Sequence, residues 1–479
     1  MVRHAFNSHH APKGPLRLTG GFAQALRTSV MCVWAVVGTM GLSVTVAHAD
    51  SLQDALGVTY QSNPTLLAAR EALRATMEQY PQAQANWMPK LSTAATASDT
   101  LSRSKTDTRS QSRTSDLKNT LSLSQPIYRG GRNFAELRKA EAAVNAQRAT
   151  YTASEQTVIL SAITAYMNVI RDRRIRDLRK ANVDLLQQRL ESTQTQYDLR
   201  RRTLTDLSQA QARLSQAKAA FVLSQSTLAS STEQYTQVIG RPPTELSLPE
   251  TLAPTTENLD DFLAQIDDLN PGILAAAYAV DQSREDVKIQ TGNRLPTLSL
   301  DASMSHSRSK ELGGAIATRS RELAGTVTLS VPLYQSGAEL SQVRAARYQT
   351  NQRLLELDAA KRTARQTAIS DWSTLQSTKA SVESFEKSAE AARVARDSIA
   401  QELEVGRRSL IDLLNADQEL LNAEISLITA HRDLVVQTYT VLRTTGQLTA
   451  SGLNLPVDVY SPQSDFERAK WNLFTTSIK

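Results

Sequence analysis

The sequence of 479 residues contains one cysteine and six histidines, and only 5% of its residues are aromatic. The cysteine, Cys32, lies in an apolar run near the N-terminus. The rest of the chain therefore has no thiol for a disulfide, a lipid anchor or a soft-metal site. The sequence also has no phosphate-binding loop and no nucleophile elbow. We therefore expect no enzyme activity, no metal and no cofactor.

Excess positive charge is also missing once residues 1–49 are set aside. That segment holds four basic residues and no acidic one, which leaves 50 basic against 48 acidic side chains and a net charge of +2. A nucleic-acid-binding protein is expected to carry a basic stripe. The balance of charge and the scarcity of aromatic residues argue against a nucleic-acid partner.

Residues 1–49 have the pattern of a secretory signal peptide. Basic residues end at Arg27, an apolar run follows from Val30 to Val46, and Ala47-His48-Ala49 gives the small-x-small pattern of a cleavage site. The alternative is a membrane anchor, but the run is shorter than the roughly 20 residues that a bilayer requires. We expect cleavage before Asp50.

The remaining chain is predicted to be an internal duplication. Asn63-Pro64 recurs as Asn270-Pro271, and the segment RRTLTDLSQA from Arg201 to Ala210 matches RRSLIDLLNA from Arg407 to Ala416 at six of ten positions. Repeats of this kind indicate copies of one structural unit. The predicted domains are a first repeat over residues 50–256, a second repeat over 257–455 and a C-terminal tail over 456–479.

Each repeat contains a long segment that favours helix. Residues 133–239 contain no glycine or proline, and residues 338–445 contain only Gly406. A helix over residues 133–200 is about 100 Å long, which exceeds a compact domain and requires the chain to reverse. An ordinary antiparallel coiled coil is the alternative. We expect long helices at 133–200 and 338–405, and return helices at 204–239 and 410–445.

Between the helices, polar and apolar residues alternate with period two. The pattern predicts one β-hairpin over about residues 90–128 and another over about 296–334, with polar links from Ser102 to Arg113 and from Ser309 to Ser320. Each run has about the 9–11 residues of a strand in an outer-membrane barrel. Four strands cannot close a barrel, since the smallest has about 8, so several chains are needed. Two soluble hairpins packed on the helices are the alternative.

The ordered set of motifs resembles the TolC-type outer-membrane channel proteins. The resemblance rests on Asn63-Pro64, WMPKL at Trp87–Leu91, QPIYRGG at Gln125–Gly131 and VGRRSLIDLLNA at Val405–Ala416, and it covers nearly the whole chain after the signal peptide. It implies a mixed α and β fold. In that fold, three chains supply four strands each to one outer-membrane barrel, which a long periplasmic α-helical barrel continues.

The resemblance also implies a function and partners. We expect a homotrimer in the outer membrane of a Gram-negative bacterium that extends into the periplasm and contacts outer-membrane lipid. Such a channel passively conducts substrates from an inner-membrane transporter, ABC-type or proton-driven, and a periplasmic adaptor, in type I protein secretion or drug efflux. The alternative from the residues alone is a secreted or surface fibrous coiled-coil protein, such as an adhesin.

The predicted functional residues lie where the long helices reverse. Thr203-x-x-Asp206 and Ser409-x-x-Asp412 both read as capping boxes, which is a purely structural role. The resemblance implies in addition that Asp412 rings the periplasmic constriction and that Arg408 belongs to the network that holds it closed. Three copies of Asp412 around one axis would favour cations. Asp206 is the equivalent residue in the first repeat.

Two positions depart from the family pattern. Asn415 stands where the best-known members have a second ring of aspartates, and Leu403 stands where they have a tyrosine. A single acidic ring and a looser lock are therefore expected. The basic residues Arg200, Arg201, Arg202, Arg407 and Arg408 predict, with Gly406 at the turn, a docking surface for an acidic adaptor tip. The alternative is that these arginines are solvated and face helix carbonyl groups.

Overall fold

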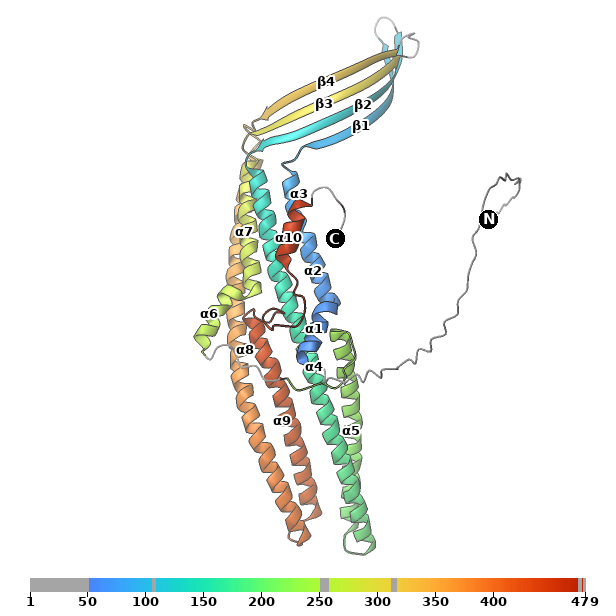
Figure 1. Cartoon of the computed structure of the whole chain (residues 1–479), viewed down its shortest axis with the longest axis vertical. Helices are drawn as coiled ribbons and strands as arrows, with labels where there is room; N and C mark the ends of the chain where they lie inside the picture. The colour runs from blue at the N-terminus through green and yellow to red at the C-terminus, as the bar shows by residue number, and fades with distance from the viewer. Residues whose placement is uncertain (1–50, 106–108, 250–257, 312–316, 473–475, 477–479) are drawn as a thin grey trace, which may run out of the picture. The chain divides into compact units, whose positions relative to one another are not determined.

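The structure is a computed structural model that describes residues 51–105, 109–249, 258–311, 317–472 and 476 (Figure 1). The predicted signal peptide, residues 1–49, lies outside the described residues. So do residues 250–257, at the predicted boundary between the two repeats. No helix in the described ranges has both the length and the apolar character that a membrane span requires.

The two halves of the chain have the same order of elements, except that one helix of the second half takes the place of two consecutive helices in the first half. In the first half these are α1 (Leu52–Ser62), α2 (Pro64–Met77), α3 (Gln79–Ala85), β1 (Lys90–Lys105), β2 (Arg109–Arg129), α4 (Arg132–Asp198) and α5 (Leu204–Ile239). In the second half they are α6 (Leu259–Leu269), α7 (Pro271–Gly292), β3 (Thr297–Glu311), β4 (Ala317–Ser330), α8 (Ala338–Glu404) and α9 (Leu410–Thr444), followed by α10 (Pro462–Trp471).

The duplicated Asn-Pro motif has the same structural role in both halves. The side-chain oxygen of Asn63 accepts hydrogen bonds from the first turn of α2, and its Nδ2 donates to the carbonyl of Val238 at 2.9 Å. Asn270 caps α7 in the same way and donates to the carbonyl of Thr444 at 3.1 Å. Because proline suits the first helical position, each motif starts one helix and fastens it to the end of the return helix.

The long helices pair into two helical hairpins. The chain runs along α4 and returns along α5, then does the same along α8 and α9, as the colours of Figure 1 show. These bounds lie within two residues of the ranges expected from the absence of glycine and proline. Helix α4 also packs against α7 and α9, so the two halves interlock through their helices.

The four strands form one antiparallel sheet in the order β1-β2-β3-β4. They are longer than the 9–11 residues expected, with 16, 21, 15 and 14 residues. The predicted links at Ser102–Arg113 and Ser309–Ser320 were too long, because the ladder continues through pairs such as Ser102↔Ser112 and Arg308↔Arg319. Backbone pairing does not require apolar side chains, so the loss of an alternating apolar residue does not end a strand.

The second hairpin also ends earlier than predicted. Alternation favours a strand up to Leu333, whereas β4 ends at Ser330. Pro332 lacks the backbone N–H that a ladder requires, which explains the difference. In β2, Pro126 is accommodated by a register shift between Pro126 and Tyr128 against β3.

The C-terminal segment packs against the first half of the chain. The sequence predicts a C-terminal tail over residues 456–479 and does not indicate whether it packs on the helices. In the described part of this segment, Phe466 of α10 is buried against Tyr80 in an edge-on contact, and the backbone N–H of Tyr460 donates to the Tyr60 hydroxyl at 3.0 Å. Arg74 of α2 donates to Asp465 at 2.9 Å. The main apolar core thus takes side chains from α1, α2, α4, α5, α9 and α10.

Candidate functional site at the helical turns

The turn between α8 and α9 is closed by backbone hydrogen bonds around Gly406. The N–H of Gly406 donates to the carbonyl of Leu403 at 3.0 Å, and that of Arg407 donates to the carbonyl of Glu402 at 2.8 Å. This pair of bonds is the Schellman motif, which requires a left-handed residue after the helix. Gly406 supplies it with φ 73°.

Asp412 closes the first turn of α9. Its Oδ2 accepts from the Ser409 hydroxyl at 2.7 Å and from the Ser409 N–H at 3.0 Å, while the Asp412 N–H donates to Ser409 Oγ at 3.3 Å. These bonds from Ser409, with the nearby positive charge of Arg408, hold the pKa of the Asp412 carboxyl below its usual value of 3.8. The capping box predicted here is present, and Asp412 is charged at neutral pH.

Arg408 is engaged within its own chain. Its Nε donates to Glu402 at 2.8 Å, and this bond is the main reason why the pKa of Arg408 is raised. Both side chains are about half exposed. Exposed pairs of this kind contribute little to stability. Arg407 is exposed beside them.

The turn between α4 and α5 repeats this arrangement. Asp206 Oδ2 accepts from the Thr203 N–H at 3.1 Å and from its hydroxyl at 2.9 Å. Arg202 donates to the Gln196 side chain at 3.0 Å, and Arg201 is exposed. The predicted residues therefore lie at two equivalent turns: Asp206, Arg201 and Arg202 at one, and Gly406, Arg407, Arg408 and Asp412 at the other.

Asn415 lies about one helical turn after Asp412 in α9, and its side chain links the two helical hairpins. Its side-chain oxygen accepts a hydrogen bond of 2.8 Å from Arg213 of α5. An aspartate at this position would form an ion pair with Arg213, whereas the amide forms a neutral acceptor contact that costs less to separate. Asn415 therefore gives a weaker link between the hairpins than an aspartate would.

A second link between the hairpins was not predicted. Asp417 of α9 is buried and lies 3.1 Å from Arg189 of α4 and 3.0 Å from Arg396 of α8. One carboxylate therefore holds three helices together. The sequence does carry a signal for it, since Asp417 is an acidic residue among Leu413, Leu414, Ala416 and Leu421, all of which are buried.

An apolar cluster fills the space between the helices at this level. It comprises Leu186, Leu214, Ala217, Leu410 and Leu414, with Val183, Leu190 and Leu403 packed against it. The side chain of Leu403, which stands where the family pattern has a tyrosine, therefore contributes packing and no hydrogen bond. Among the described residues, no group of three or more His, Asp or Glu side chains is placed to hold a metal ion.

A known protein family matches both halves of the chain. The family model described as outer membrane efflux protein matches residues 55–241 and again residues 263–447. The two matches span equivalent elements, from α1 to the end of α5 and from α6 to the end of α9.

Individual relatives match over most of their length. The chain is 30% identical to outer membrane efflux protein BepC of Brucella suis over 88% of this chain and 91% of that protein. It is 26% identical to outer membrane protein TolC of Escherichia coli over 70% of each. Among solved structures, the CmeC outer membrane channel of Campylobacter jejuni superposes with a TM-score of 0.73 at 16% identity, covering 88% of this chain and 89% of that one. This last likeness concerns the fold.

Proposed function

Because this chain belongs to the outer membrane efflux protein family, whose members are outer-membrane channels and not enzymes, we propose that it is the exit duct of a tripartite export system. Three copies form one channel that crosses the outer membrane and continues into the periplasm. The channel conducts substrates passively, and a partner supplies the energy. The alternative of a surface fibre is not supported, because the family match covers both halves of the chain.

The sheet supports a barrel shared between chains. Its outer strands β1 and β4 each pair with one neighbour only, and three copies supply twelve strands, above the minimum of about 8 for a closed barrel. Pairing β4 of one copy with β1 of the next removes the open edges. One face carries Leu121, Leu300, Met304, Leu323 and Val327, all of them exposed in the single chain. This face suits contact with lipid.

The helices support the same assembly. Helix α8 has 67 residues, of which only six are buried. Its exposed apolar side chains are Leu340, Tyr348, Leu354, Leu355, Ile369, Phe385 and Val394. Apolar surface repeated along a helix of this length indicates an interface. In the proposed trimer, these side chains pack against the neighbouring copy and the chain's own helices close the tube with it.

The two turns form the periplasmic entrance in this proposal. Asp412, held ionised by its capping bonds, lines the constriction in three copies, with Arg408, Asp206 and Asn415 around it. Three carboxylates around one axis raise the local concentration of cations and repel anions. Because Asp412 also caps α9, one residue serves both the fold and the selectivity of the channel.

The exposed tips of the hairpins form the docking surface for the adaptor. Arg201, Arg202, Gly406 and Arg407 lie in or next to the two turns, and the arginines give them positive charge. This surface is complementary to an acidic adaptor tip. An inner-membrane transporter, ABC-type or proton-driven, completes the export system. The first 49 residues serve as the signal peptide, residues 50–256 and 257–455 as the two repeats, and the C-terminal tail begins at 456.

The proposal is tested by single-channel conductance of the purified protein in planar bilayers. Wild type is expected to give a small cation-selective conductance, and Asp412→Asn is expected to lose most of that selectivity, read from reversal potentials. Ser409→Ala is the matched control, because it removes the capping hydroxyl and keeps the charge of Asp412. Equal selectivity in wild type and Asp412→Asn would restrict Asp412 to capping, and absence of conductance from folded protein would contradict the duct.

A further inference from the structure

Most of the basic side chains near the hairpin loops of the sheet lie on one of its two faces. Successive residues of a strand point to opposite faces, and paired residues share a face. The pairs Met304↔Leu323, His306↔Arg321 and Arg308↔Arg319 therefore lie on one face, in that order toward the β3–β4 loop. The same face carries the apolar side chains that suit lipid contact. It thus changes from apolar to basic within two residues along β1 and β4, and within four along β2 and β3.

The basic part of this face extends over all four strands. It comprises Arg103 and Lys105 of β1, Arg113 of β2, Arg308 and Lys310 of β3, and Arg319 and Arg321 of β4, and we name these seven residues the basic band. Asp99 is the acidic residue on the same face, and it pairs with Arg113. Asp116, Glu311 and Glu322 lie on the opposite face by alternation, together with one basic residue of β2, Lys118.

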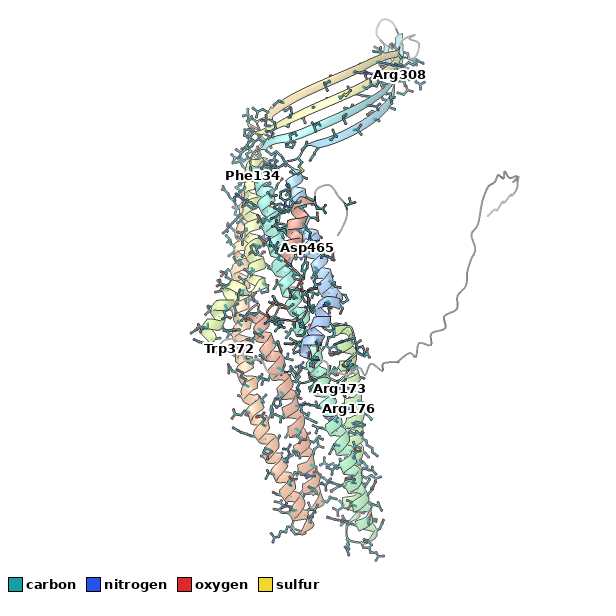
Figure 2. All side chains as sticks on the ribbon, viewed as in Figure 1. Phe134, Arg173, Arg176, Arg308, Trp372 and Asp465 are labelled. Carbon is teal, nitrogen blue, oxygen red and sulfur yellow. The ribbon has the colours of Figure 1, made fainter. Side chains whose placement is uncertain are left out.

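The basic band lies at the end of the sheet away from the helices. The strands join α3, α4, α7 and α8 at their other ends, whereas Lys105, Arg109, Glu311 and Ala317 flank the two hairpin loops. Arg308 is labelled at this hairpin end in Figure 2. At the helix-linked end, Trp87 and Phe134 stack edge-on at 4.4 Å between ring centroids, and both are exposed. Aromatic side chains of this kind mark a membrane interface.

The arrangement of the basic band is unfavourable without an anion. Arg308 and Arg319 are directly opposite each other, and like charges at such positions destabilise a sheet. In the described part of the chain, neither forms an ion pair, and both are exposed, as are Lys310 and Arg321. Guanidinium groups bind phosphate through paired N–H donors. A phosphate group between the strands would offset this repulsion.

We propose that the basic band binds the phosphate groups of the lipid in the outer leaflet of the outer membrane, the phosphorylated glycolipid built on lipid A. The inference rests on the proposed barrel, which turns the apolar face toward the bilayer and the hairpin loops toward the exterior. The acyl chains contact the apolar side chains, and the phosphates meet Arg308, Lys310, Arg319 and Arg321 directly beyond them. In the trimer, three such bands surround the barrel.

The test compares lipid retention by three proteins in nanodiscs of phosphatidylcholine with a small fraction of lipid A. The neutralised variant carries Arg308→Gln, Lys310→Gln, Arg319→Gln and Arg321→Gln. The matched control carries Arg308→Lys, Arg319→Lys and Arg321→Lys, which keep the charge. Lipid A that remains with the protein after detergent extraction is counted by native mass spectrometry. The same measurement uses lipid A from which both phosphates have been removed.

Wild type and the lysine control are expected to retain lipid A. The neutralised variant is expected to retain at least roughly tenfold less lipid A, because each basic residue attracts an anionic surface. Dephosphorylated lipid A is expected to be retained poorly by all three. Equal retention of lipid A by the neutralised variant, or of the dephosphorylated lipid by wild type, overturns the proposal.

Channel conductance of each protein separates this outcome from failure of the proposed function. A neutralised variant that conducts like wild type and has lost lipid A supports the inference. A variant that conducts and retains lipid A overturns the inference and leaves the duct intact. If folded wild-type protein does not conduct, that result contradicts the proposed barrel and also the inference that rests on it.

Discussion

Arg200 and Gly406 occupy the same left-handed position at the ends of the two long helices. Their φ angles are 59° and 73°, and the residue that follows each donates its N–H to the third-last helical residue at 2.8 Å. Only Gly adopts this conformation without strain. For an L-residue with a Cβ, the left-handed conformation costs roughly 1 kcal/mol of conformational free energy. The first turn is therefore strained where the second is not.

We predict that Arg200→Gly stabilises the turn between α4 and α5 by about 0.5–1 kcal/mol, and that Gly406→Ala destabilises the other turn by a similar amount. No atom lies within 4 Å of the position of a Cβ at Gly406, so the effect there is conformational. Hydrogen exchange of the amides in each turn measures it. Arg201→Gly is the control, because Arg201 lacks a positive φ, and it should destabilise. Equal effects of the two glycine substitutions would contradict the prediction.

We predict that Asp417→Asn loosens the junction of the two helical hairpins by about 2–3 kcal/mol, since it leaves Arg189 and Arg396 without their shared carboxylate. Asp397→Asn is the matched control: it removes an exposed partner of the same Arg396 and should cost less than about 1 kcal/mol. Thermal unfolding of the purified protein compares the two. Similar losses from both substitutions would argue against a clamp at Asp417.

We predict that Glu155 makes stability depend on pH. Its carboxyl is buried in α4 and accepts the N–H of Ala450 at 2.8 Å, and burial raises its pKa above the usual 4.5 despite this bond and the nearby Arg70. The folded state therefore binds the proton more tightly than the unfolded state. This group's contribution to stability is fully present below the unfolded pKa of about 4.5 and is lost as the pH rises through the folded pKa.

Glu155→Gln keeps an acceptor for Ala450 and removes the charge. The thermal midpoint of the variant is expected to exceed that of wild type at neutral pH, and the difference is expected to shrink as the pH falls toward 4.5. Asp465 lies beside Arg74 and its pKa is lowered, so its contribution to stability changes with pH in the opposite direction and at lower pH. Because Asp465 is present in both proteins, this contribution is common to wild type and variant. A difference that does not change with pH would exclude titration of Glu155.

Local rules of sequence were sufficient for the bounds of the long helices and for the N-terminal caps of the return helices. Thr203-x-x-Asp206 and Ser409-x-x-Asp412 predict capping boxes because hydroxyl and carboxylate are three residues apart, and both boxes are present. Local rules failed for the strand ends, where pairing with a neighbouring strand continues past the apolar alternation. They also missed the left-handed Arg200, because the turn is set by the packing of the two helices it joins.

Contacts between distant elements could not be predicted from one sequence. Asp417 meets Arg189 and Arg396 from three different helices, and no spacing along the chain specifies that meeting. The C-terminal segment is a similar case. Its aromatic residues Tyr460 and Phe466 gave no indication of their partners, which come from residues about 400 positions earlier.

The contact between the C-terminal segment and the first half of the chain restricts the order in which the protein can fold. The main core joins Leu52 to Ala469, so it cannot close until the chain has been translocated as far as Ala469. Closing so long a loop is entropically costly and slow. Until then, the Tyr60 hydroxyl lacks its hydrogen bond from the N–H of Tyr460, and the Glu155 carboxyl lacks its hydrogen bond from the N–H of Ala450. The newly exported chain must therefore spend time with its core open, which makes that interval, and not the finished channel, the stage most exposed to aggregation and proteolysis.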